Sequence, residues 1–242
     1  MIISTQGIDI VDELNLYLMT EGLKPASLVT LDPLHLDGKY NIKHEENTMF
    51  IYEDSDIKLT PEHITQFRDV LDKIDVAYHQ NKTKTWQTYN EDGKSINVEE
   101  ILFQVGKDKS SLENVLDAQN DNAIGLALGF PLEAAKAYKT NINDELRDGN
   151  YIQASLAKAK QAGLELPTWL AYINHVPENL DLVGGNVSKT TQALGEAYQF
   201  FVRNNNPELA ERVEHHFLDR KIPDQWKLTP GGIYTIQFNP VS

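Results

Sequence analysis

The sequence predicts an α+β fold with a small antiparallel sheet and helices in its N-terminal half and a mainly helical C-terminal half. Apolar residues at steps of three and four, such as Ile64, Phe67 and Leu71, indicate amphipathic helices. Short apolar runs separated by turn residues, as in residues 26–57, are typical of antiparallel strands. From about residue 122 the chain becomes richer in alanine and its patterns are helical.

The N-terminal half begins with a helix that we expect to run from about Ile8 to Thr20. Gly22 follows as a stop signal. Two or three antiparallel strands are then predicted within residues 26–57, where Asp37-Gly38 is a dipeptide that favours a hairpin turn.

A second helix is predicted to start at Thr60-Pro61, because a capping hydroxyl precedes a proline at the first helical position. Residues 83–89 alternate and are rich in β-favouring side chains, which predicts another strand. A turn follows this strand. Residues 95–105 then return either as its hairpin partner or as a short helix.

The C-terminal half contains several start and stop signals for helices. Pro131 and Pro207 each predict a helix start, and Gly163 predicts the end of a helix over residues 151–162. A further helix is marked by apolar residues from Val187 to Phe201.

A last strand is predicted at residues 233–238, which alternate and follow two glycines. We expect this strand to return to the N-terminal sheet. The organisation is therefore an acidic α+β region over residues 1–120 and a mainly helical region over residues 121–242, or one compact domain that contains both.

Composition narrows the classes of function. The 242 residues include 36 acidic and 22 basic side chains, a formal charge of −14, and no cysteine. This charge repels phosphate backbones and anionic headgroups, so we expect neither a nucleic-acid partner nor a membrane partner. The lack of cysteine excludes disulfides, thiolate metal sites and cysteine nucleophiles. No signal sequence or long apolar segment is present, and we expect a soluble cytoplasmic protein.

A glycine-rich turn precedes the predicted helix that begins near residue 187. Gly184, Gly185 and Asn186 would present backbone N–H groups to an anion, and Lys189 would add a positive charge. The phosphate-loop pattern is not met, because both of its required glycines are missing. An anion-binding site is one hypothesis, and the alternative is a flexible turn in which Asn186 is the N-cap of the helix.

A histidine and a carboxylate flank a proline turn just upstream, in His175-Val176-Pro177-Glu178. We expect His175 and Glu178 to be the candidate catalytic residues, with His175 as acid or base and Glu178 or Asn174 orienting it. The alternative is a histidine that makes only a structural hydrogen bond.

Metal binding is not expected. His215 and His216 lie near Glu211 and Asp219, but adjacent histidines on a helix point about 100° apart and cannot share one ion. The acidic clusters do not match the calcium-loop pattern. We therefore expect neither a metal nor a cofactor.

Two short islands, Leu128-Gly129-Phe130-Pro131 and His175-Val176-Pro177, resemble a family of uncharacterised prokaryotic proteins. That family carries an L-G-Y-P motif followed by paired cysteines, and further on an H-V-P-C motif. Glu133, Ala134 and Glu178 stand here where the family has cysteines, so thiol or metal chemistry does not transfer. The resemblance implies no activity.

Two classes of function follow. The first is a binding or interaction domain that recognises a small molecule or a protein partner through the C-terminal half. The alternative is an enzyme that performs acid–base or hydrolytic chemistry on an anionic small molecule. In that enzyme His175 would be the centre, and Gly184, Gly185, Asn186 and Lys189 would hold the anionic group. The oligomeric state does not follow from the sequence.

Overall fold

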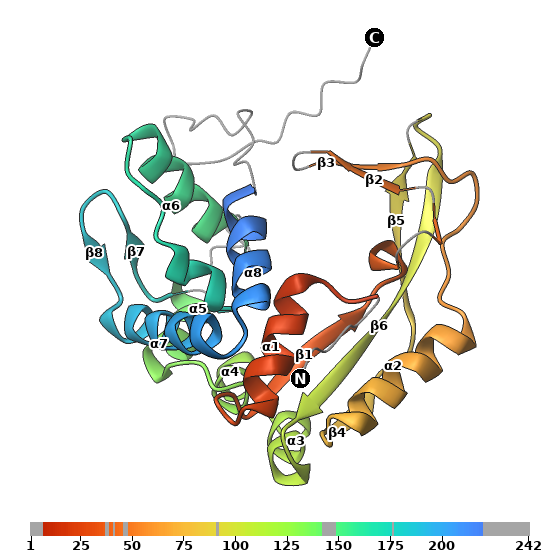
Figure 1. Ribbon diagram of the computed structural model, residues 1–242, viewed down its shortest axis with the longest axis horizontal. Coiled ribbons are helices and arrows are strands. Elements are labelled where there is room, and N and C mark those ends of the chain that lie inside the picture. The colour runs from red at the N-terminus through yellow and green to blue at the C-terminus, as the bar shows by residue number, and fades with distance from the viewer. Residues whose placement is uncertain are drawn as a thin grey trace.

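The computed structural model describes residues 7–36, 39–40, 42–45, 48–90, 92–141, 149–175 and 177–219. The α+β class is confirmed, with the sheet in the N-terminal half (Figure 1). Two expectations, the turn at Asp37-Gly38 and the strand at residues 233–238, lie outside the described residues.

The helices include two short 3₁₀ segments, η1 and η2. They are α1 (Ile10–Thr20), η1 (Pro33–His35), α2 (Pro61–Lys73), α3 (Lys109–Leu116), α4 (Asp121–Ala127), α5 (Leu132–Asn141), α6 (Gly149–Gln161), η2 (Thr168–Tyr172), α7 (Lys189–Asn205) and α8 (Pro207–Asp219). The predicted starts at Pro131 and Pro207 are confirmed within a residue.

Among the described residues, the strands form one sheet built on β6 and two separate hairpins. They are β1 (Ala26–Leu31), β2 (Ile42–Glu45), β3 (Thr48–Ile51), β4 (Ala77–Gln80), β5 (Lys84–Tyr89), β6 (Ser95–Gly106), β7 (Leu180–Asp181) and β8 (Asn186–Val187). Strand β6 pairs antiparallel with β1, β4 and β5, while β2 pairs with β3 and β7 with β8. Residues 95–105 are therefore the hairpin partner of residues 84–89, not a helix.

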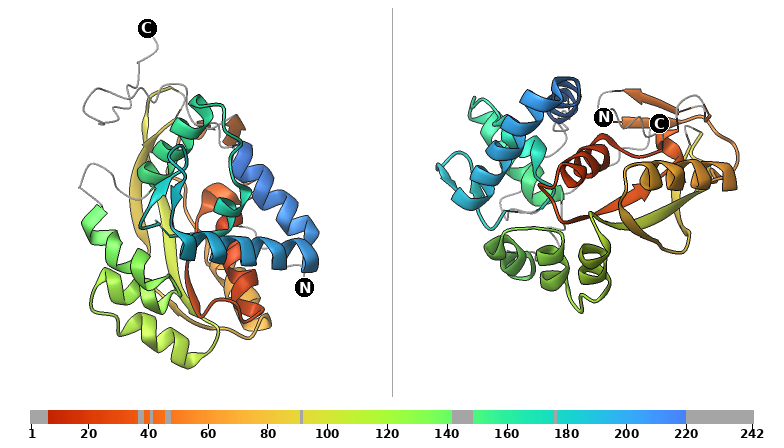
Figure 2. Two further views of the ribbon diagram at one scale, coloured as in Figure 1. Left: turned by 90° about the vertical axis from the view of Figure 1, so that its left-hand side faces the viewer. Right: turned by 60° about the horizontal axis from the view of Figure 1, so that its bottom comes forward.

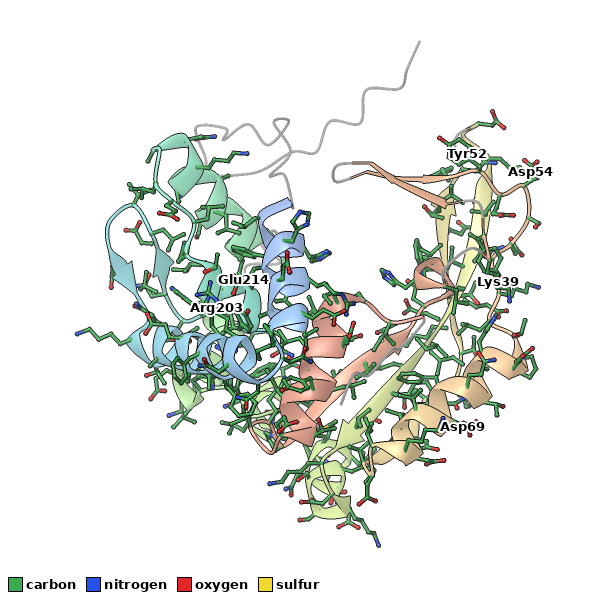
Figure 3. The ribbon with its side chains drawn as sticks, in the orientation of Figure 1. Lys39, Tyr52, Asp54, Asp69, Arg203 and Glu214 are labelled. Atoms are coloured by element: carbon green, nitrogen blue, oxygen red, sulfur yellow. The ribbon has the colours of Figure 1, made fainter. Side chains whose placement is uncertain are left out.

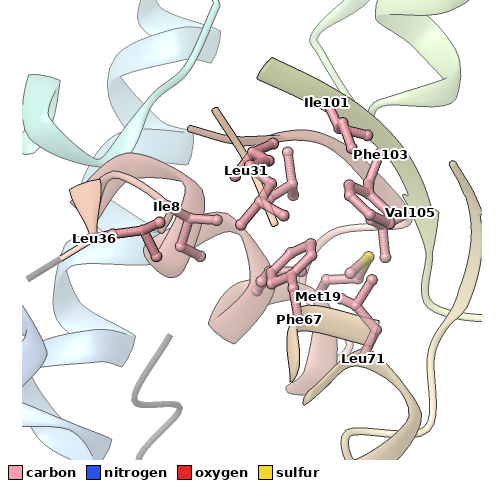
Figure 4. Packing of buried hydrophobic residues seen from close by; sticks show 12 residues of the cluster. Ile8, Met19, Leu31, Leu36, Phe67, Leu71, Ile101, Phe103 and Val105 are labelled. Atoms are coloured by element: carbon pink, nitrogen blue, oxygen red, sulfur yellow. The ribbon is translucent and has the colours of Figure 1, made fainter. Parts of the chain in front are cut away.

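The first core lies between the sheet, α1 and α2. Phe67 of α2 meets Phe103 of β6 edge to face, with ring centroids 4.9 Å apart. Met19 of α1 belongs to the same cluster (Figure 4), as does Leu16. The apolar stripe of α2 is thus the side of the helix that faces this core, where Phe67 and Leu71 are buried.

The opposite face of α1 belongs to a second core. Leu14, Tyr17 and Leu18 pack there against side chains of η2, α7 and α8. Figures 1 and 2 show α1 between the sheet and these C-terminal helices. Because α1 has a core on both faces, every residue from Glu13 to Met19 is buried. The boundary near residue 120 stays a prediction.

Membrane insertion by a helix has no support in this structure: none of the helices it describes combines the length and the apolar character that crossing a bilayer requires.

Candidate functional site

A buried lysine lies where α1 turns into β1. The backbone N–H groups of Leu23 and Lys24 both donate to the carbonyl of Leu18, which folds this turn back onto α1. Lys24 is consequently only 3% exposed. Its Nζ donates to Asn15 Oδ1 at 2.9 Å and to Asn174 Oδ1 at 3.1 Å, so one amine ties α1 to the segment that follows η2.

The charge state of this cluster is set by burial. Burial lowers the pKa of Lys24 to about 7, although the nearby Asp12 carboxylate acts in the opposite direction. Burial, followed by the charge of Asp9, raises the pKa of Asp12 to about 7, while the Thr30 N–H and Lys24 oppose this shift. An amine and a carboxyl group that both have a pKa of about 7 thus lie in one enclosed region.

His175 is also buried, at 6% exposure, and it contacts this region. Its Nε2 lies 3.2 Å from Thr191 Oγ1 in the first turn of α7. Burial, and then the charge of Lys24, lowers the pKa of His175 to about 4. The imidazole is therefore neutral near pH 7.

The two sequence islands meet at His175. The Phe130 ring lies 5.1 Å from the His175 ring, centroid to centroid, and Lys24 Nζ lies 5.8 Å from the centre of the Phe130 ring. Gly129 has φ +83°, and a Cβ atom there would approach Pro25 Cδ to 2.7 Å. The turn between α4 and α5 therefore packs directly on Lys24-Pro25.

The two residues of the predicted catalytic pair have different hydrogen-bond partners. His175 bonds the fully buried Thr191, whereas the Glu178 carboxylate accepts a hydrogen bond from Ser188 Oγ. Because His175 and Thr191 are both enclosed, a substrate could reach them only after the chain moves. The catalytic role of His175 and Glu178 stays a prediction.

Ser188 is the N-cap of α7, since its Oγ accepts from the Thr191 N–H at 3.2 Å. The interpretation of Asn186 as the N-cap was wrong: Asn186 is in β8, where it pairs with Asp181.

The predicted anion-binding residues lie on and beside the β7–β8 hairpin. The Gly184 N–H donates to Asp181 Oδ1 at 2.9 Å, so a carboxylate of the chain itself accepts from this turn. Gly185, Asn186 and Lys189 are exposed. The anion-binding role of these residues stays a prediction, and an incoming anion would meet Asp181 there.

Metal-binding groups are dispersed in the described ranges: among those residues no three His, Asp or Glu side chains lie close enough together to hold an ion. His215 and His216 are both exposed on α8.

A cleft with a cavity volume of about 300 Å³ lies between α1, η2, α6 and α8. Its wall is mostly apolar and includes Ile10, Ile152, Leu156 and Leu170, among others. The polar side chains at the wall are Asp9, Asn174 and His216. Asn174 connects the cleft to the buried cluster, because its Oδ1 is the acceptor of Lys24 Nζ.

One wall of the cleft is held by a polar network. Arg203 of α7 and Glu214 of α8 point toward one another (Figure 3), and they bond at 2.7 and 2.8 Å. Tyr172 of η2 donates to the same carboxylate at 2.7 Å. The bidentate pair and the tyrosine fix η2, α7 and α8 relative to one another.

The second attachment of α8 is an ion pair with α1. Arg212 donates to both carboxylate oxygens of Glu13, at 2.9 and 2.6 Å. This pair holds α8 beside the start of α1.

Comparison of the chain with protein-family models, characterised proteins and solved structures finds no match. The resemblance to the uncharacterised prokaryotic family stays a prediction.

Sequence reasoning identified Asn174 and His175 but missed Asp9, Asn15 and Lys24. Asp9 is the N-cap of α1, but the helix was predicted from Ile8 and so included Asp9, and a cap does not by itself indicate a ligand. Lys24 gave none, since a lysine in a turn is ordinarily solvated.

Proposed function

We propose that this protein binds a small, partly apolar molecule in the cleft between α1, η2, α6 and α8. The observation that carries the proposal is the cavity of about 300 Å³ with apolar walls and a few polar side chains. Small-molecule sites commonly begin at this size and have this composition.

The groups behind the cleft add support. Asn174 at its wall accepts from Lys24, and the pKa values of Lys24 and Asp12 are both shifted to about 7. Titratable groups with strongly shifted pKa values cluster at functional sites more often than elsewhere. A small molecule in the cleft would contact Asn174 and would not need to reach the enclosed His175 ring.

The test is a thermal-shift screen of compact aromatic and aliphatic compounds against the native protein and two variants. Ile152→Trp places a larger side chain at the wall of the cleft, so compounds that stabilise the native protein should lose their effect. A ligand present at 100 times its Kd adds about 2.7 kcal/mol to the free energy of unfolding, a shift that is easily measured.

Leu126→Trp is the matched control. Leu126 is 44% exposed on α4 and does not line the cleft, so the same kind of enlargement should leave every response intact. Stabilisation that survives Ile152→Trp unchanged would place the ligand elsewhere and contradict the proposal.

A further inference from the structure

The orientation of the Asn174 carboxamide is determined by Lys24. A lysine amine donates hydrogen bonds, so the atom of Asn174 that faces Nζ at 3.1 Å is the oxygen. Lys24 is itself held by Asn15 at 2.9 Å and is buried. The amide nitrogen of Asn174 therefore points away from Lys24.

That nitrogen belongs to a residue of the cleft wall. Asn174 is exposed and lines the cavity. Among the described residues, Lys24 is the one hydrogen-bond partner of the Asn174 side chain. The Nδ2 group can thus donate to an acceptor oxygen of a ligand.

The second polar group of the cleft is acidic. Asp9 caps α1 by accepting from the Asp12 N–H through Oδ1 at 2.7 Å, which leaves Oδ2 for another donor. The charge of Asp9 contributes, after burial, to the raised pKa of both Asp12 and Asp32, so the surroundings of this end of α1 are acidic.

Two basic side chains near this end of the cleft, Arg212 and Lys24, are already engaged. Arg212 is paired with Glu13 through both carboxylate oxygens, and Lys24 is enclosed behind Asn174. A ligand anion would therefore meet net negative charge, whereas a ligand cation would be complemented by it.

We propose that the ligand of the cleft is a compact apolar amine that also carries a carbonyl oxygen, with the oxygen accepting from Asn174 Nδ2 and the ammonium group beside Asp9. The apolar part of the molecule packs on the aliphatic wall. This assignment rests on the proposed function and adds the chemical class of the ligand to it.

Four probes built on one aromatic ring test the class. They are 4-(aminomethyl)benzamide with both groups, benzylamine with the amine, benzamide with the carbonyl, and benzoate with a negative charge. Titration calorimetry on the native protein should rank the two-group compound tightest and benzoate weakest. We expect at least about a tenfold difference in Kd between these two, the scale of one charge-assisted hydrogen bond.

Two variants assign the two contacts separately. Asp9→Asn keeps a good helix cap but removes the charge, so it should weaken both amines about tenfold and leave benzamide unchanged. Asn174→Asp keeps an acceptor for Lys24 but replaces the amide donor by a negative charge, so it should weaken benzamide and bind benzylamine at least as tightly as the native protein does.

The outcomes distinguish the ligand class from the proposed function. If benzoate binds as tightly as 4-(aminomethyl)benzamide and Ile152→Trp abolishes both, the cleft binds small molecules but the class is wrong. If no probe binds, or if binding ignores Ile152→Trp, the proposed function fails together with the class. A dimer that forms without any probe and is disrupted by Ile152→Trp would show a second copy of the chain in the cleft, and would overturn the proposal.

Discussion

Replacement of Gly129 by alanine is expected to lower the free energy of unfolding by about 3 kcal/mol. Two costs combine at this position. The backbone has φ +83°, which strains any residue with a side chain, and the new Cβ would meet Pro25 Cδ at 2.7 Å. Pro25 is next to the buried Lys24 and cannot retreat freely. Chemical denaturation of the purified variant measures the loss.

Gly163→Ala is the matched control for this substitution. Gly163 follows α6 with φ +71°, and nothing lies within 4 Å of its missing Cβ. Alanine at this position should lower the free energy of unfolding by only about 1 kcal/mol, the cost of its strained backbone. Equal losses at the two positions would mean that the α4–α5 turn does not pack on Lys24-Pro25, and the contact between Phe130 and His175 would lose its support.

Replacement of Lys24 by methionine is expected to change how stability depends on pH. Burial lowers the pKa of Lys24 from 10.5 to about 7 in the folded protein. Between these two pH values the unfolded chain binds more protons than the folded chain, so stability from this group rises with pH. The native protein should therefore gain about 2 kcal/mol relative to Lys24→Met from pH 7 to pH 9.

Urea denaturation of both proteins across this pH range makes the measurement. The raised pKa of Asp12 has the opposite sign, but its effect acts between pH 3.8 and about 7 and lies mostly below the window. A stability difference that stays constant from pH 7 to pH 9 would show that Lys24 is charged and solvated in the folded state.

Local patterns predicted much of the fold. The stripe of Ile64, Phe67 and Leu71 and the cap at Thr60 placed α2 correctly, because an amphipathic helix with a capping residue is encoded within one short segment. The ambiguity at residues 95–105 was different in kind. In this long strand the alternation of buried residues changes phase between Val98 and Ile101, so a single alternating pattern does not identify it.

The candidate site could be predicted only in part. The islands at Phe130 and His175 were each noticed, but 45 positions separate them, and only tertiary packing brings their rings to 5.1 Å. The burial of Lys24 follows from a turn that folds back onto α1, and the cleft follows from the packing of four segments. Neither has a signature in any short stretch of sequence.

The N-cap of α7 was assigned to Asn186 instead of Ser188, again because the assignment depends on pairing between segments. Asn186 and Ser188 are both good capping residues, and the sequence does not say which one ends the hairpin. Pairing of Asn186 with Asp181 in β8 assigns the cap to Ser188.

Methyl NMR tests the central claim, ligand binding in the cleft, most directly. The protein would be labelled at its isoleucine and leucine methyl groups and titrated with 4-(aminomethyl)benzamide. We expect saturable shifts at Ile10, Ile152, Leu156 and Leu170, which line the cleft, and none at the exposed Leu126. Shifts that are confined to other methyl groups, or that do not saturate, would contradict it.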